Sequence, residues 1–364
     1  MRILYITPRI NNQGGVAKVL SIKTDYLIRK WGHEIHILTQ NKGNEDLFFS
    51  FHPKIRLHDN ILKGKGLAYF RSYQQQLQQT VDAVQPDLVI VTDNGYKAFL
   101  IPYTLKTKAR LIFESHGSLY NTEKPMGRIG TQGVTRFKKI GVKRYDLVVF
   151  LSKANQEEWG IFAKAKVIPN PIVLPGEKST VTRTQTVIAV SRNSYEKGID
   201  RLLAIWQKVA QANPDWKLVI YGSTEGYYDL NQLATEFGIL NSVSFLAPVR
   251  DIEAEYDRAA VYAMTSRFEG FPMVLLEAMR SGLPTIAYDC PCGPAAIIEN
   301  EHTGFLIADE AILDYANALD TLLKEAELRN KLGANAQQAV KKYEASVIME
   351  EWNTVLHSLI STTI

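Results

Sequence analysis

Residues 261–279 are VYAMTSRFEGFPMVLLEAM. The apolar run Val261–Met264 predicts a buried β-strand, and Pro272 suits the first position of the helix that follows the turn. Glu269 lies in that turn, while Glu277 lies about a turn and a half into the helix, between apolar residues. Because a carboxylate in an apolar helix needs a polar partner, we expect Glu277 to have one.

The same alternation of short apolar runs and helical patterns extends in both directions from this stretch. Amphipathic segments such as 16–30 and 69–84 separate the runs, and long helical patterns follow residue 310. Apolar strands that alternate with helices are typical of a doubly wound parallel sheet, so the sequence predicts an α/β fold. Strands are expected at Arg2–Thr7, Glu34–Thr39, Ile55–Leu57, Leu88–Thr92, Leu111–Glu114, Leu147–Leu151 and Lys166–Ile168, and then at Val187–Val190, Lys217–Tyr221, Val243–Phe245, Val261–Met264, Thr285–Ala287 and Gly304–Ile307.

The 364 residues suit two domains. Pro169-Asn170-Pro171 ends the first block of strands, and the turn-rich stretch that follows has linker composition. We therefore predict an N-terminal, acceptor-side Rossmann-like domain, a linker, a nucleotide-sugar-binding Rossmann-like domain and a C-terminal helix that packs back on the first domain. Their predicted bounds are 1–172, 173–186, 187–345 and 346–364.

Charge is divided unevenly between the two halves. Residues 1–172 carry 26 Lys and Arg against 13 Asp and Glu, whereas the remainder carries 16 against 25. The densest basic segment, Lys124–Arg144, holds seven cations and no acid (Lys124, Arg128, Arg136, Lys138, Lys139, Lys143 and Arg144). It predicts an anionic partner such as a membrane surface, although a solvated helix face is the alternative. No nucleic acid is expected as a partner.

Several polar residues follow predicted strands, where ligands of such folds bind. Gly14-Gly15 opens a helix after the first strand, an arrangement suited to a phosphate, although a plain loop would look the same. Arg192 and Lys197 offer a fork and a point charge to a diphosphate, unless both are solvated. His116 follows Leu111–Glu114; the alternative there is a loop histidine held by backbone.

Taken in order, these segments resemble the retaining GT-B glycosyltransferases of family 4. The family's EX7E motif is matched by Glu269 and Glu277. The resemblance extends through nearly the whole chain and rests on Gly14-Gly15, His116, Ser191-Arg192, Lys197-Gly198, Tyr221-Gly222, Ser266–Pro272, Glu277–Met279, Gly282–Pro284, Asp289–Pro294 and Gly304–Leu306. Residues 193–196 and 221–224 depart from the common pattern.

The resemblance implies two Rossmann-like domains that face a central cleft, and it implies site residues. Glu277 would hold the ribose hydroxyls, and Glu269 with the backbone of Gly270 and Phe271 would face the transferred sugar. Arg250 would lie near the base. The implied catalytic residues are His116, Arg192, Lys197 and Glu269, and the implied donor-binding residues are Gly14, Gly15, Arg192, Lys197, Arg250, Glu269, Gly270, Phe271 and Glu277.

These observations predict a glycosyltransferase that uses a nucleotide-diphosphate sugar, with UDP-hexose or UDP-N-acetylhexosamine expected, and a lipid-linked glycan acceptor. No metal or other cofactor is expected, because the chain contains no Asp-x-Asp motif. The alternatives are a GDP-mannose-dependent mannosyltransferase, a GT-B nucleotide-sugar epimerase and a binding protein without catalysis. With two cysteines and no apolar run of membrane-spanning length, we expect a cytoplasmic protein that binds the inner membrane face peripherally.

Overall fold

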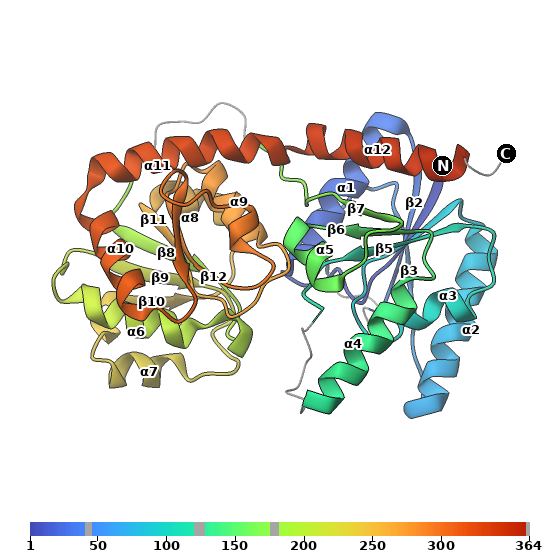
Figure 1. The fold of residues 1–364 in the computed structure, drawn as a ribbon, viewed down its shortest axis with the longest axis horizontal. Helices are drawn as coiled ribbons and strands as arrows, with labels where there is room; N and C mark the ends of the chain where they lie inside the picture. Colours follow the sequence, from blue (N-terminus) through green and yellow to red (C-terminus); the bar gives the residue numbers. More distant parts are fainter. Residues whose placement is uncertain (41–45, 120–127, 175–181, 362–364) are drawn as a thin grey trace. The chain divides into compact units, whose positions relative to one another are not determined.

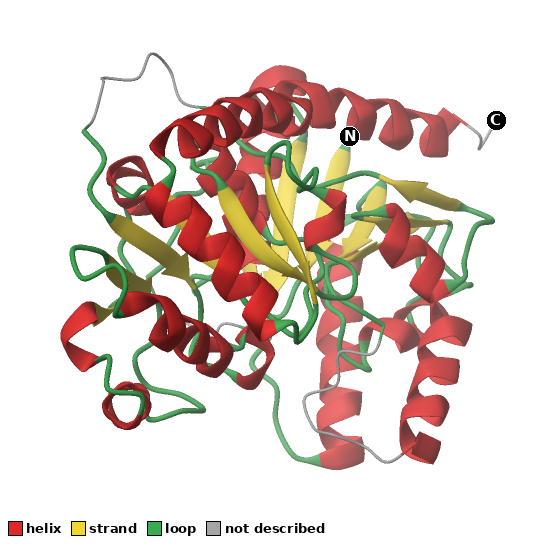
Figure 2. Ribbon diagram, turned by 60° about the vertical axis from the view of Figure 1, so that its left-hand side comes forward, coloured by secondary structure: helices red, strands yellow, loops and turns green. Residues whose placement is uncertain are grey.

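The computed structural model describes residues 1–40, 46–119, 128–174 and 182–361, which form two compact units (Figure 1). The first unit consists of Met1–Val173 and Ala345–Ile364, and the second of Leu174–Glu344. In each unit the strands lie inside and the helices lie outside (Figure 2). Each unit is therefore described by itself.

The first unit is built on a seven-stranded parallel sheet in the order β3-β2-β1-β4-β5-β6-β7. Its strands are β1 (Arg2–Ile6), β2 (Glu34–Thr39), β3 (Arg56–Asp59), β4 (Leu88–Val91), β5 (Arg110–Ser115), β6 (Leu147–Phe150) and β7 (Ala165–Val167). Its helices are α1 (Gly15–Trp31), α2 (Gly66–Val84), η1 (Ala98–Leu100), α3 (Ile101–Thr104), α4 (Arg128–Val142), α5 (Lys153–Trp159) and, from the other end of the chain, α12 (Ala345–Ser361).

Alternation along β1 shows why this sheet is covered on both faces. Ile3 and Tyr5 pack in one core with α1 and α12, while Leu4 and Ile6 pack in another with α2, α4 and α5. All four side chains are at most 2% exposed. A strand buried on both sides has no polar face, which explains the continuous apolar runs in the sequence.

The second unit has a six-stranded parallel sheet in the order β10-β9-β8-β11-β12-β13. Its strands are β8 (Thr186–Val190), β9 (Lys217–Tyr221), β10 (Val243–Leu246), β11 (Val261–Met264), β12 (Thr285–Asp289) and β13 (Gly304–Ala308). Its helices are η2 (Tyr195–Lys197), α6 (Ile199–Ala210), α7 (Leu230–Glu236), η3 (Leu240–Ser242), α8 (Ile252–Arg258), α9 (Met273–Arg280), η4 (Pro294–Ala296), α10 (Ile312–Lys324), α11 (Ala326–Ala339) and η5 (Val340–Tyr343).

The two sheets confirm the predicted α/β class with two Rossmann-like domains. Each expected strand is present, and its ends agree with the expectation to within two residues. The helix of the opening stretch begins at Met273, with Pro272 at its N-cap, one residue later than expected. Among the described residues, no helix combines the length and the apolar character needed to cross a membrane.

Candidate functional site

A lysine and a glutamate meet at the carboxyl ends of two neighbouring strands in the second unit. β8 and β11 are hydrogen-bonded neighbours, so the segments that follow them lie at the same sheet edge. Lys197 Nζ donates to both oxygens of Glu269, at 2.7 and 2.9 Å, and Ser266 Oγ donates to Oε1 at 2.6 Å. Glu269 is only 9% exposed, whereas the Lys197 side chain is 21% exposed. The arrangement joins a buried carboxylate to a lysine whose side chain is still partly exposed.

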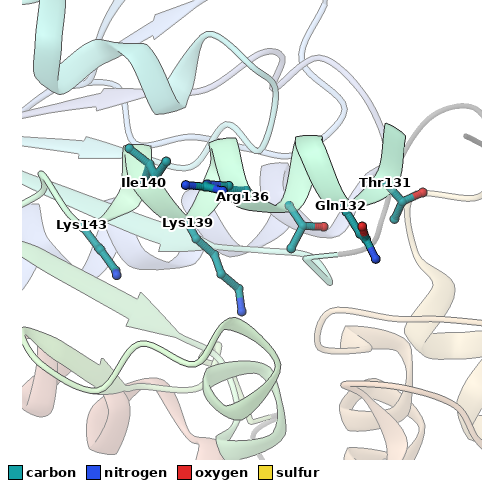
Figure 3. Close-up of a pocket in the computed structure, with 7 residues that line it drawn as sticks. Thr131, Gln132, Arg136, Lys139, Ile140 and Lys143 are labelled. Carbon is teal, nitrogen blue, oxygen red and sulfur yellow. The ribbon is translucent and has the colours of Figure 1, made fainter. Parts of the chain in front are cut away.

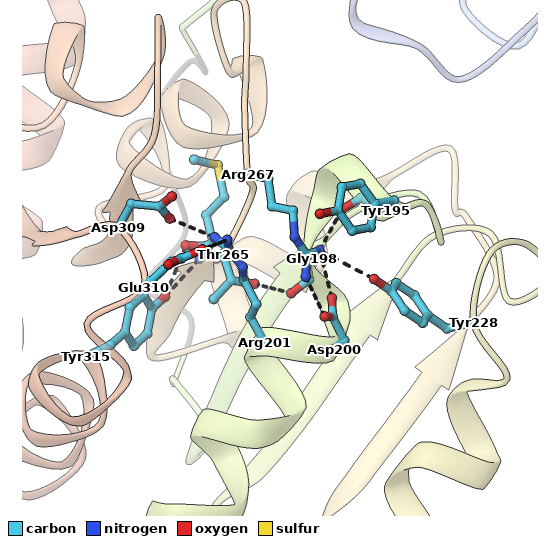
Figure 4. Close-up of polar contacts among 11 residues, drawn as sticks. Tyr195, Gly198, Asp200, Arg201, Tyr228, Thr265, Arg267, Asp309, Glu310 and Tyr315 are labelled. Carbon is cyan, nitrogen blue, oxygen red and sulfur yellow. Dashed lines mark hydrogen bonds and ion pairs between the residues drawn. The ribbon is translucent and has the colours of Figure 1, made fainter. Parts of the chain in front are cut away.

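Gly198 explains why Lys197 lies at this place. It follows η2 with a φ of +63°, and a Cβ there would lie 2.2 Å from the carbonyl oxygen of Thr265. Thr265 Oγ1 in turn donates to the Gly198 carbonyl at 2.8 Å (Figure 4). Because only glycine permits both the left-handed backbone and this close approach, the Lys197-Gly198 pair fixes the turn against the end of β11.

The second glutamate of the opening stretch, Glu277, is also buried. It lies on α9 with 4% of its surface exposed, and Tyr256 of α8 donates its hydroxyl to Oε2 at 3.2 Å. Burial, together with the charge of Glu277, raises the pKa of Tyr256 well above its usual value, so this phenol stays a donor. The expected polar partner is present, and it is a residue that the sequence did not single out.

Phe271 and Gly270 occupy the turn before α9. The Phe271 ring is buried and packs edge to face on Tyr343 with centroids 5.7 Å apart. Phe271 can therefore serve a ligand only through its backbone, as the resemblance implied. Gly270 is partly exposed beside it.

The two predicted arginines are more exposed than Lys197. Arg192 Nη2 donates to Glu196 at 2.6 Å across an i,i+4 spacing, and its side chain is 68% exposed. Arg250 is exposed in the turn between β10 and α8. The structure thus brings Lys197 to Glu269 but pairs Arg192 with Glu196.

The two segments in which the sequence departs from the family pattern are in contact with each other. Asn193 Nδ2 donates to the carbonyls of Thr224 and Tyr228, at 3.3 and 2.8 Å, and Asn193 Oδ1 accepts from Tyr228 N at 3.1 Å. The rings of Tyr195 and Tyr227 lie 5.7 Å apart and are at least half exposed. Their separation in sequence concealed that these are one structural feature.

A further polar cluster holds η2 against the sheet. Arg267 donates to both oxygens of Asp200, at 3.0 and 2.6 Å, and its guanidinium carbon lies 4.1 Å from the centroid of the Tyr195 ring (Figure 4). These hydrogen bonds to Asp200 raise the pKa of Arg267 above its usual value. Arg267 was quoted only as part of the motif, and the structure shows its positioning role.

In the first unit, the glycine pair and the histidine lie at strand ends. Gly14 is the N-cap of α1, and its N–H donates to Asn12 Oδ1 at 2.8 Å; Gly15 is the first helical residue. The side chain of His116, just beyond β5, is 4% exposed, and its Nε2 lies 3.2 Å from Glu114 Oε1. Neither Glu114 nor its partner on α1, Lys23, was predicted as a site residue. The sequence did contain a signal for Glu114, because it is a single carboxylate in an otherwise apolar run of a predicted strand.

The basic segment is only partly a surface feature. Lys124 lies outside the described residues, and the Arg128 side chain is not described. Arg136, Lys139 and Lys143 line a surface hollow of ≈ 520 Å³ on α4 (Figure 3). Lys138 instead is 5% exposed and donates to the Leu119 carbonyl at 3.0 Å. Its inclusion in an exposed basic face is therefore wrong, because the helix turns it inward, where burial lowers its pKa.

Two family models match the chain in consecutive halves. The model described as Glycosyltransferase Family 4 matches residues 13–175, and the model described as Glycosyl transferases group 1 matches residues 176–339. Between them, these two models cover every strand of both sheets except β1.

Known proteins resemble the chain over nearly its full length. An uncharacterized glycosyltransferase of Haemophilus influenzae is 29% identical over 98% of this chain and 99% of its own length. The amylovoran biosynthesis glycosyltransferase AmsD of Erwinia amylovora is 26% identical over 98% of this chain and 99% of its own. A TarM variant of S. aureus, crystallised with fondaparinux, alpha-GlcNAc-glycerol and UDP, superimposes with a TM-score of 0.84 at 14% identity, over 98% of this chain and 99% of that one.

Proposed function

Because this chain belongs to the GT-B glycosyltransferases, with a family 4 domain followed by a group 1 domain, we propose that it uses a UDP-sugar donor. The transferred group would be a hexose or an N-acetylhexosamine, and the acceptor a glycan of a cell-surface polysaccharide or lipopolysaccharide. The amylovoran transferase and the UDP complex of TarM support this choice by analogy.

The observation that carries the proposal is the contact between Lys197 and Glu269. Lys197 Nζ is held within 2.9 Å of both carboxylate oxygens, yet about a fifth of its side chain remains exposed. An ammonium so placed can bind a diphosphate oxygen without losing its carboxylate partner. Glu277, fixed by Tyr256, would accept hydrogen bonds from the ribose hydroxyls.

We assign a retaining, front-face substitution to this site. The bond from the anomeric carbon to the diphosphate oxygen breaks while the acceptor oxygen bonds on the same face, and the departing diphosphate takes the acceptor's proton. Lys197 and Arg192 would stabilise the charge that develops on the diphosphate, since preorganised cations act most strongly in the transition state. His116 would donate a hydrogen bond to a sugar hydroxyl or accept one from it.

The acceptor is proposed to be anionic and lipid-linked. Arg136 and Lys139 of α4 line the hollow together with Lys143, which directly follows the helix, and Arg144 is exposed next to it. Such a face suits a diphosphate-linked acceptor or an anionic membrane surface, where each cation contributes about 1 kcal/mol. The proposal includes peripheral association with the inner membrane face.

Metal independence is part of the proposal, and it rests on the lack of an Asp-x-Asp motif in the sequence. The cationic side chains Lys197 and Arg192 would provide the charge stabilisation that a divalent ion supplies elsewhere. Initial rates in excess chelator should equal those with magnesium or manganese. Turnover that disappears in chelator and returns with metal would contradict this assignment.

A donor screen by thermal shift tests the function. UDP and UDP-sugars should raise the melting temperature, because a ligand that binds only the folded state stabilises it. GDP and GDP-mannose should raise it less. A larger shift with the guanosine compounds would favour the mannosyltransferase, and sugar conversion without acceptor-dependent UDP release would indicate an epimerase. No shift with any nucleotide would contradict the proposal.

A further inference from the structure

A buried ion pair lies directly beneath His116 in the first unit. Lys23 Nζ of α1 is 2.7 and 2.6 Å from the two oxygens of Glu114 at the end of β5. The side chains of Lys23 and Glu114 are 0% and 1% exposed. His116, the residue directly after β5, lies next to the same carboxylate, with its Nε2 3.2 Å from Glu114 Oε1.

Such a pair is not explained by stability alone. Two buried charges lose their hydration, and neutral residues of the same shape are often as stable. Here the Trp352 ring of α12 covers Lys23, with Nζ 3.6 Å from the ring centroid. Burial would raise the pKa of Glu114, but Lys23 and His116 together lower it to about 2, so the carboxylate stays charged.

The imidazole of His116 lies beside this pair. Its Nε2 is buried and lies 3.2 Å from Glu114 Oε1, but it makes no hydrogen bond to the described residues. Catalytic hydrogen bonds are often loosely aligned without substrate and tighten in the complex. A full negative charge at this distance favours a proton on Nε2 over a lone pair there.

We propose that Lys23 and Glu114 are positioning residues that act through His116. Glu114 holds the proton on Nε2 and so leaves Nδ1 unprotonated, ready to accept a hydrogen bond from a substrate hydroxyl. Lys23 keeps the carboxylate charged inside the core. The inference rests on the proposed role of His116, but the tautomer can be measured without any substrate.

The first test is a nitrogen-15 NMR spectrum of histidine-labelled protein at pH about 8.5, where an ordinary histidine is neutral. The His116 signals are assigned by their loss in His116→Gln. In the wild type, His116 should be the Nε2–H tautomer. In the double variant Lys23→Met/Glu114→Gln it should become a mixture or the Nδ1–H form. An Nε2–H tautomer that persists in the folded double variant overturns the proposal.

The second test is a kinetic cycle. The double substitution should lower kcat about tenfold to a hundredfold, as small misplacements of a catalytic group do, and leave UDP affinity within twofold. In a His116→Ala background the same double substitution should hardly change kcat, because His116→Ala has already removed the effect that the pair exerts through His116. An equal loss in both backgrounds would mean that the pair is only structural. The matched control is the exposed pair on the same helix, Asp25→Asn/Arg29→Gln, which should leave kcat unchanged.

If the double variant Lys23→Met/Glu114→Gln does not fold, a more conservative variant can replace it. Glu114→Asp keeps the charge next to Lys23 but withdraws the carboxylate by one methylene from His116, so it should fold and still lose the tautomer preference. If this variant keeps both the wild-type tautomer and the wild-type kcat, the proposal is wrong. Failure of every nucleotide to bind would refute the proposed function instead, and the NMR result would still decide the role of the pair.

Discussion

At the scale of single residues, the second unit holds two buried carboxylates, one in the turn after β11 and one within α9. Glu269 and Glu277 are both nearly inaccessible, and each has a defined donor: Lys197 and Ser266 for Glu269, and Tyr256 for Glu277. Hydrogen bonds to charged groups are stronger than neutral ones, so these donors fix the carboxylates before a ligand arrives. This preorganisation lowers the cost of binding.

The proposed ribose contact makes Glu277 the residue to change. Glu277→Ala should weaken UDP binding tenfold to a hundredfold, because a hydrogen bond to a charged group contributes roughly 1.5–3 kcal/mol. Isothermal titration of UDP measures the loss. Tyr256→Phe is the matched control: it removes the Tyr256 hydroxyl but keeps the carboxylate, so its effect should be smaller. Equal UDP affinity in a folded Glu277→Ala protein would refute the ribose assignment.

At the scale of elements, α4 shows how the rotation of one helix divides its charges. Lys138 and Lys139 are neighbours in sequence, yet Lys138 turns inward to the Leu119 carbonyl while Lys139 lines the surface hollow. Ile140, half exposed, lies among the cations (Figure 3). A basic face with an apolar side chain is typical of helices that lie on anionic membranes.

The basic face of α4 predicts a salt-sensitive association with membranes. The variant Arg136→Gln/Lys139→Gln/Lys143→Gln should bind vesicles of anionic lipid about a hundredfold more weakly, at about 1 kcal/mol for each cation. Wild-type sedimentation with vesicles should fall steeply between about 50 and about 500 mM salt. UDP affinity should not change.

The control for this prediction removes three exposed cations from the second unit instead. Its substitutions are Lys208→Gln, Lys331→Gln and Lys341→Gln. If both triple variants sediment with vesicles as the wild type does, the face of α4 is merely solvated and the acceptor binds elsewhere.

At the scale of the whole molecule, the first unit is assembled from both ends of the chain. α12 follows the second unit in sequence but contributes Ile348, Met349, Trp352, Val355 and Leu356 to the core that contains β1 and α1. Ala345 N also donates to the Ile172 carbonyl at 2.8 Å. The core of the first unit is therefore complete only when α12 has joined it.

Trp352 tests this dependence. Trp352→Ala should destabilise the first unit by about 3–5 kcal/mol, as expected for a large buried aromatic side chain. Hydrogen exchange followed by mass spectrometry should then quicken in β1, β2 and α1 but not in the second unit. Trp206→Ala, at a fully buried tryptophan of the second unit, should give the opposite pattern. Faster exchange in both units for either variant would show that they do not unfold separately.

The sequence by itself determined the strands, the fold class and the places of the two glutamates. Strands buried on both faces are continuous apolar runs, and this local signal survives without knowledge of the partners. The turn at Glu269 and the helix around Glu277 follow from residues within one short stretch. Because the ends of the strands could be located in the sequence, the polar residues that follow them could be identified as well.

Only the tertiary structure decided which side chains meet. Lys23 and Glu114 are 91 positions apart, and Asn193 joins two turns that the sequence lists separately. Lys138 faces inward although Lys139, the next residue in the sequence, is equally basic. The type of a residue indicates whether it prefers water or the core. Which side chain it contacts depends on the order of the strands and on the rotation of each helix, and the packing of the whole unit sets both.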